Sequence, residues 1–96
     1  MNVCFLSGKV ISKIKFDFLY NKENISIASF FIEVCDKKYF DNKESKIHKN
    51  LVKIEAFNEL ADYCYSKLKE GDFLFLEGKV LIKNNNIVVN ACNLYY

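Results

Sequence analysis

The sequence predicts an all-β fold, a small barrel of five strands with one helix between the third and fourth strands. The first observation behind this prediction is a repeated phrase, Phe5-Leu6-Ser7-Gly8-Lys9-Val10-Ile11 and Phe75-Leu76-Glu77-Gly78-Lys79-Val80-Leu81. Each copy alternates apolar residues around a glycine, and glycine within a strand marks a bulge or bend because it has no Cβ. Two strands bent at equivalent points favour a strongly curved barrel. The alternative is that two ordinary amphipathic strands each contain a glycine by coincidence.

Length and charge restrict the possibilities further. With 96 residues and no proline, the chain is predicted to form one domain over 1–96. The net charge is only +2, and all fourteen basic residues are lysine. Lysine binds phosphate as a point charge and lacks the bidentate fork with which arginine recognises guanine. If the chain binds nucleic acid, we therefore do not expect recognition of base edges to be its strength.

The N-terminal half is predicted to contain two strands. The first covers residues 2–20, where apolar and polar residues alternate, and a turn follows over 21–24. The second covers 25–36, with Phe31 directed outward. Its core face comprises Ala28, Phe30, Ile32 and Val34.

A polar segment over 37–50 separates the second strand from the third and holds five lysines. The third strand covers 51–57. Its inward residues are Val52, Ile54 and Ala56, and its outward residues are Lys53, Glu55 and Phe57.

The second observation behind the barrel is a single helical stripe. Asn58 supplies a side chain for an N-cap, Gly71 is placed as the C′ glycine, and the helix covers roughly 59–69. Its apolar positions are Leu60, Ala61, Cys64 and Leu68. A fourth strand over 72–83, a turn over 84–86 and a fifth strand over 87–94 follow. This order of three strands, a helix and two strands is that of the OB-fold, whose helix plugs the open end of the barrel.

Catalytic and metal-binding patterns are missing from the sequence. His48 is the single histidine and lies in the lysine-rich segment, so no catalytic residues, metal site or cofactor are predicted, and the chain is not expected to be an enzyme. The four cysteines lack zinc spacing, and neither a signal peptide nor an apolar run long enough for a membrane span is present. We expect a cytoplasmic protein with reduced cysteines and no membrane contact; a disulfide or an intermolecular thiol contact is the alternative.

Four phrases in order resemble the bacterial single-stranded DNA-binding protein family, in its small OB-fold form. They lie at residues 2–10, 27–34, 57–62 and 69–80, and the last contains the Gly-Asp turn and a Glu-Gly-Lys-Val strand. The resemblance implies sequence-tolerant binding of single-stranded DNA, with RNA as an alternative, in replication, recombination or repair. It also implies a homodimer or homotetramer, as do the outward apolar residues Phe31, Phe73 and Phe75.

The chain departs from the family pattern in several places. It has no tryptophan, Leu51 aligns with one of the family's stacking tryptophans, and only three asparagines connect the last two strands. The printed sequence ends without the acidic tail through which the family recruits replication partners, as in the primosomal relatives. The alternative function is therefore an OB-fold scaffold for proteins, with weak or lost DNA binding.

Aromatic rings interleaved with lysines define the predicted binding surface, because bases stack on rings while lysines neutralise phosphates. Phe57 is assigned from the family's stacking aromatic, Tyr39 and Phe40 from their place in the loop, and Phe31 from its outward direction. The predicted lysines are Lys37, Lys38, Lys43, Lys46, Lys49 and Lys53. The alternatives are that Phe31 lies in a subunit interface, that Phe40 or Phe57 packs locally, and that the lysines form a solvated face.

Overall fold

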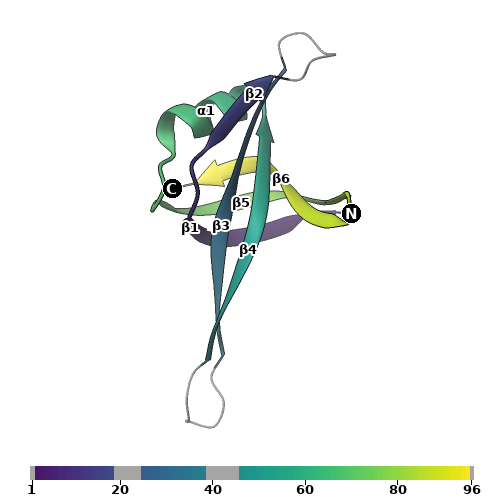
Figure 1. The fold of residues 1–96 in the computed structure, drawn as a ribbon. Coiled ribbons are helices and arrows are strands. Elements are labelled where there is room, and N and C mark those ends of the chain that lie inside the picture. The colour runs from purple at the N-terminus through teal and green to yellow at the C-terminus, as the bar shows by residue number, and fades with distance from the viewer. Residues whose placement is uncertain (1, 19–24, 39–45, 96) are drawn as a thin grey trace.

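The computed structural model describes residues 2–18, 25–38 and 46–95, with the backbone alone for 35–38 and 46–49. It contains six labelled strands and one helix within these ranges (Figure 1). Their bounds are β1 Cys4–Val10, β2 Lys15–Phe18, β3 Ser26–Lys38, β4 Lys46–Phe57, α1 Glu59–Lys67, β5 Phe73–Lys83 and β6 Asn86–Tyr95.

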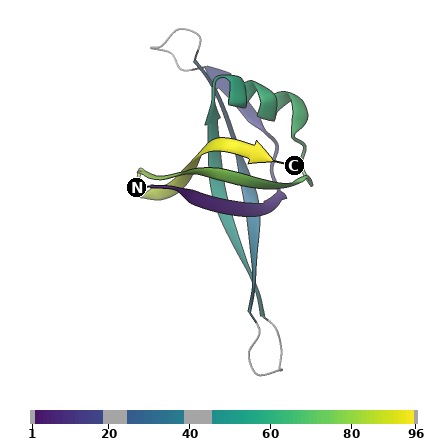
Figure 2. The ribbon, with the colours of Figure 1, turned by 180° about the vertical axis from the view of Figure 1, so that it is seen from behind.

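Five of these strands close into a barrel. The order around it is β1-β5-β6-β4-β3, and β3 pairs again with β1 at Lys9 and Val10. The β4–β6 pairing is parallel, and the remaining pairings are antiparallel. Figure 2 shows β1, β5 and β6 side by side, running across the direction of β3 and β4. The predicted barrel, with its helix between the third and fourth barrel strands, is confirmed.

The two glycines that first suggested the barrel lie where strands approach each other closely. A Cβ on Gly8 would lie 2.5 Å from the Glu33 carbonyl oxygen, at the point where β1 meets β3. A Cβ on Gly78 would collide with the Asn90 carbonyl, beside a register shift at Glu77/Gly78 in the β5–β6 ladder. Both positions therefore require glycine for close backbone approach, and at Gly78 the register shift is the bulge that the repeat predicted.

The predicted first strand over 2–20 is wrong in one respect, because β1 and β2 are separate. After Val10, the Ile11 amide donates to the Phe31 carbonyl at 3.0 Å, while the Ser12 hydroxyl accepts from the Phe31 amide at 2.9 Å. The Ser12 side chain thus takes the place of a backbone carbonyl as the partner of the Phe31 amide. Beyond this point the chain no longer pairs with β5, and it continues as β2, which pairs with β3. Alternation of apolar residues continues through this break and does not reveal it.

The predicted core faces are confirmed. Ala28, Phe30, Ile32, Ile54 and Ala56 are buried, while Val34 and Val52 are partly buried and pack against them. The core also contains Val10 from β1, four residues from β5 and β6, and three from the helix and the residue after it: Leu74, Leu76, Val89, Ala91, Ala61, Cys64 and Leu68. The helix therefore covers the barrel with the predicted stripe.

Both predicted helix caps differ from the structure. Asn58 precedes the helix with φ 57°, a value that asparagine tolerates, but its side chain makes no capping hydrogen bond. Instead, the Ser26 hydroxyl donates to the Asn58 carbonyl and to Asp62 Oδ1, each at 3.3 Å. The helix ends at extended Leu68, and Gly71 (φ 101°) belongs to the following turn, where its amide donates to the Val10 carbonyl at 2.7 Å.

Beyond the barrel, β3 and β4 continue as a two-stranded arm (Figure 1). Among the described residues, 34–38 and 46–50 pair only with one another, because β1 contacts β3 no further than Glu33 and β6 contacts β4 only at 53–55. The third strand thus begins at Lys46, earlier than predicted, and the polar segment contributes to both sides of the arm.

Candidate nucleic-acid interface

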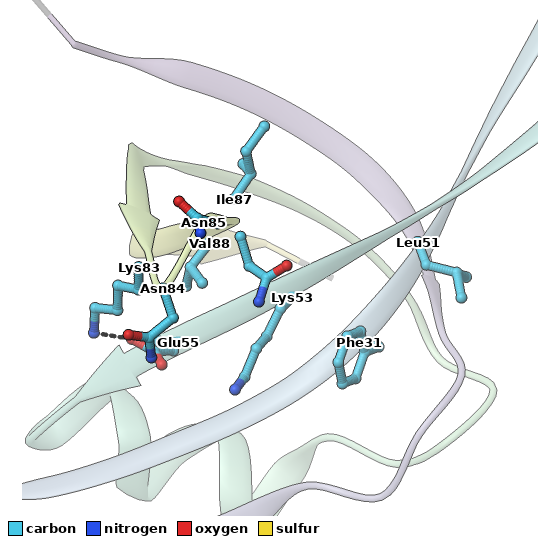
Figure 3. A pocket seen from close by; sticks show the side chains of 10 residues that line it. Phe31, Leu51, Lys53, Glu55, Lys83, Asn84, Asn85, Ile87 and Val88 are labelled. Atoms are coloured by element: carbon cyan, nitrogen blue, oxygen red, sulfur yellow. Dashed lines mark hydrogen bonds and ion pairs between the residues drawn. The ribbon is translucent and has the colours of Figure 1, made fainter.

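A groove of about 710 Å³ lies on the outer face of the barrel, where the arm begins (Figure 3). Its walls come from β3, β4 and the hairpin that joins β5 to β6. The lining residues are Phe31, Leu51, Lys53, Glu55, Lys83, Asn84, Asn85, Asn86, Ile87 and Val88.

Phe31 and Lys53 form the centre of this groove. They are directly opposite each other in the β3–β4 ladder, so both side chains project from the same face of the sheet. The ring of Phe31 is 41% exposed, and Leu51, two residues before Lys53, is also exposed. An accessible aromatic ring beside an amine is the arrangement that holds a stacked base and its phosphate. The predicted outward direction of both residues is confirmed, and the structure brings them together.

An ion pair connects β4 to the hairpin. Lys83 Nζ donates to Glu55 Oε1 at 2.8 Å, and Figure 3 shows this contact beside Lys53. The Glu55 residue is only 7% exposed, although it lies on the outward face of its strand, while the Lys83 side chain is 46% exposed. The groove contains two lysines and one glutamate among its lining residues, which leaves one net positive charge.

The hairpin is tight, as the three consecutive asparagines predicted. Asn84 (φ 50°) and Asn85 (φ 66°) both adopt positive φ, which a two-residue type I′ connection requires. Lys83 then pairs with Asn86, and the exposed side chain of Ile87 lines the groove. The asparagine run marks in the sequence where the hairpin turns, but no local pattern indicates that Lys83 and Ile87 line the groove.

The other predicted binding residues do not line this groove. Phe57 is half-buried, pairs with Ile27 on the outer face and lies four residues along β4 from Lys53. Lys37, Lys38, Lys46 and Lys49 belong to the arm, where the structure describes their backbone alone. Tyr39, Phe40 and Lys43 lie outside the described residues.

A second apolar surface covers the outer face of β1, β5 and β6. Phe5 and Phe75 stack with ring centroids 6.1 Å apart, and Tyr95 follows at 6.0 Å from Phe75. Phe73 on the same strand is 66% exposed. We call Phe5, Phe73, Phe75 and Tyr95 the aromatic face. It is formed by strands other than those that carry Phe31, so the outward phenylalanines of the sequence separate into two surfaces.

Two further observations concern the part of the chain that the structure describes. Within it, no group of histidine, cysteine, aspartate and glutamate side chains is arranged to hold a metal ion. The one helix found there is too short and too polar to cross a membrane.

The fold is therefore an oligonucleotide/oligosaccharide-binding (OB) fold. Three features define it: the closed barrel, the parallel pairing of β4 with β6, and the groove over β4, which is the third strand of the barrel in chain order. More particularly, the chain belongs to the single-strand binding protein family, whose model matches residues 1–88.

Solved structures show the same fold at low sequence identity. The SSB domain of a Synechococcus sp. protein has a TM-score of 0.79 at 13% identity, with 100% of this chain and 96% of that chain covered. A small single-stranded DNA-binding protein from Streptomyces coelicolor has a TM-score of 0.78 at 17% identity, covering 98% and 90%. The protein PriB from Ralstonia solanacearum has a TM-score of 0.80 at 10% identity, covering 100% and 97%. A search of curated protein sequences found no match.

Proposed function

We propose that this protein binds single-stranded DNA in the groove, by base stacking and lysine–phosphate contacts, with little dependence on sequence along most of the site. The observation that carries the proposal is the direct pairing of exposed Phe31 with Lys53 in a groove of a single-strand binding family member. A ring offers its face to any unstacked base, whereas the bases of a duplex are already stacked on one another. The protein acts by binding and not by catalysis.

The arm extends this surface. Its lysines follow directly from the groove along β3 and β4, so a strand that leaves Phe31 passes beside them. With Tyr39, Phe40 and Lys43 in the connecting segment, and Phe57 at the other end of β4, we propose a continuous binding surface. The cellular setting is replication, recombination or repair in the cytoplasm, and RNA is a second ligand to be tested.

The aromatic face supports a homo-oligomer, a dimer or a tetramer. Four large apolar rings on the outer face of three neighbouring strands form a patch that a second copy of the chain can cover. Light scattering at micromolar concentration should give a mass that is a multiple of 11.2 kDa. Phe75→Lys should lower this mass to that of a monomer, while Phe18→Lys, outside the aromatic face, should not. A wild-type monomer would contradict the proposed assembly.

Binding of single-stranded and duplex oligonucleotides of one length, followed by fluorescence anisotropy, tests the function. We expect tighter binding of the single strand and a linear fall of log K with log salt. If Lys37, Lys38, Lys43, Lys46 and Lys49 neutralise about four phosphates, the slope is about −3, from about −0.7 per contact. Equal affinity for duplex, or a slope near zero, would refute the proposal. No binding to either ligand would instead favour the OB-fold scaffold for proteins.

A further inference from the structure

Glu55 is an unexpected residue in a groove for a polyanion. It lines the groove between the two lysines, Lys53 and Lys83, and a carboxylate there repels every phosphate that those lysines attract. It also projects from the same strand face as Lys53, two residues away, which is about 7 Å along a strand. A role for Glu55 in nucleic-acid binding must therefore involve the bases and not the backbone of the strand.

One of the two carboxylate oxygens of Glu55 has no hydrogen-bond partner in the described part of the chain. In the described part of the chain, Lys83 donates the single side-chain hydrogen bond that Glu55 accepts, and this bond goes to Oε1. No buried side-chain oxygen in that part lacks a hydrogen-bond partner. Because Oε2 has none, it is not fully buried, and because Glu55 lines the groove, a ligand bound there can approach this oxygen. An ionised carboxylate accepts several hydrogen bonds, so Oε2 can take one from a ligand while Lys83 holds Oε1.

We propose that Glu55 makes this groove discriminate between bases, by accepting a hydrogen bond from an exocyclic amino group. The inference rests on the proposed function. A base that stacks on Phe31 has its phosphate near Lys53 and directs its polar edge along β4 toward Glu55. Cytosine presents an N4 amino donor at that edge. Uracil and thymine present an O4 acceptor at the same position, and an acceptor facing a carboxylate is repelled.

The neighbours of Glu55 are suited to holding the carboxylate in one place. Lys83 fixes Oε1 from the hairpin, and the Cα partners of Glu55 are Ser29 on β3 and Asn90 on β6, so the residue lies between two strands. An acceptor held in one place discriminates more strongly than a mobile one, because the ligand does not have to order it. The basic residues are all lysine and gave no reason to expect recognition of bases, whereas the fixed carboxylate of Glu55 is such a reason.

Oligo-dC and oligo-dU of equal length test this proposal on the wild-type protein. Both are pyrimidine strands without the thymine methyl group, and they differ at the edge that meets Glu55. We expect the wild type to bind oligo-dC at least about fivefold more tightly, the lower end of the range for one good base contact. Equal affinity for the two strands would overturn the inference while leaving single-strand binding established. Failure to bind either strand would refute the proposed function as well.

Two variants assign the discrimination to this carboxylate. Glu55→Gln keeps the size of the side chain and an oxygen for Lys83, but it adds a donor that uracil O4 accepts, so the dC-to-dU ratio should fall to near one. Glu33→Gln is the matched control, because it removes the same charge from β3 outside the groove lining; it should change both affinities alike and keep the ratio. Circular dichroism checks that each variant is folded. A ratio that persists in folded Glu55→Gln would overturn the proposal.

Discussion

Replacing Phe31 with alanine is the most informative single substitution. The ring lies in the groove, 41% exposed, opposite Lys53, and the residue pairs through its backbone with Ser12 and Ile11. Alanine keeps those backbone bonds and removes only the stacking surface. Base stacking on an aromatic ring contributes about 1–3 kcal/mol, so Kd for a single strand should rise about 5- to 150-fold.

We do not expect the rise in Kd of Phe31→Ala to come from a loss of folding stability. Truncating a fully buried phenylalanine costs about 3–5 kcal/mol, and a ring with this exposure should cost well below that range. Anisotropy titration of a labelled oligonucleotide measures the change in Kd, and urea unfolding measures the change in stability. Phe18→Ala is the matched control, since that ring is 58% exposed on β2, outside the groove lining. Wild-type affinity in folded Phe31→Ala would refute the assignment of stacking to this ring.

Three further predictions concern the rest of the surface and the core. Phe57→Ala and Tyr39→Ala should each weaken single-strand binding by about 1–3 kcal/mol; if Phe57→Ala instead lowers only stability in urea unfolding, its half-buried ring packs locally. Lys53→Ala should make the salt slope less steep by about 0.7 and weaken binding of all sequences alike, whereas an unchanged slope would exclude a phosphate contact. Burial raises the pKa of the Cys64 thiol from 9.0 to about 12. As pH rises, the thiol therefore loses its proton in the unfolded chain before it does so in the folded protein, and the free energy of unfolding should fall between pH 9 and pH 12. Between pH 8 and pH 10 the free energy of unfolding, measured in urea, should fall by about 1.4 kcal/mol in the wild type. It should fall by less in Cys64→Ala, and an equal fall in both proteins would show that Cys64 is not the cause.

The barrel could be predicted from the sequence because its determinants are local. Gly8 and Gly78 lie within alternating strands, and each marks a close approach between backbones. The outward direction of Phe31 and Lys53 followed from period-two alternation. The break between β1 and β2 could not be predicted in this way. It depends on the hydrogen bond that the Ser12 hydroxyl accepts from the Phe31 amide, and these two residues are 19 positions apart in the sequence.

The candidate site was only partly accessible to sequence reasoning. Alternation predicts that Glu55 points outward, but nothing local indicates that Lys83, 28 residues later, approaches it to form the ion pair. That contact depends on the parallel pairing of β4 with β6, which places the hairpin over the groove. Similarly, alternation gives the same outward direction to Phe31 and Phe75, and only barrel closure assigns them to separate surfaces.

Mapping amide chemical shifts while a short oligo-dC is added to the labelled protein tests the central claim most directly. If single strands bind in the groove, the largest changes should occur at Phe31, Leu51, Lys53 and Ile87, which three separate strands bring together. Amides of the aromatic face, at Phe5, Phe75 and Tyr95, should move little. Large changes confined to that face, with the groove amides unmoved at saturation, would contradict the claim.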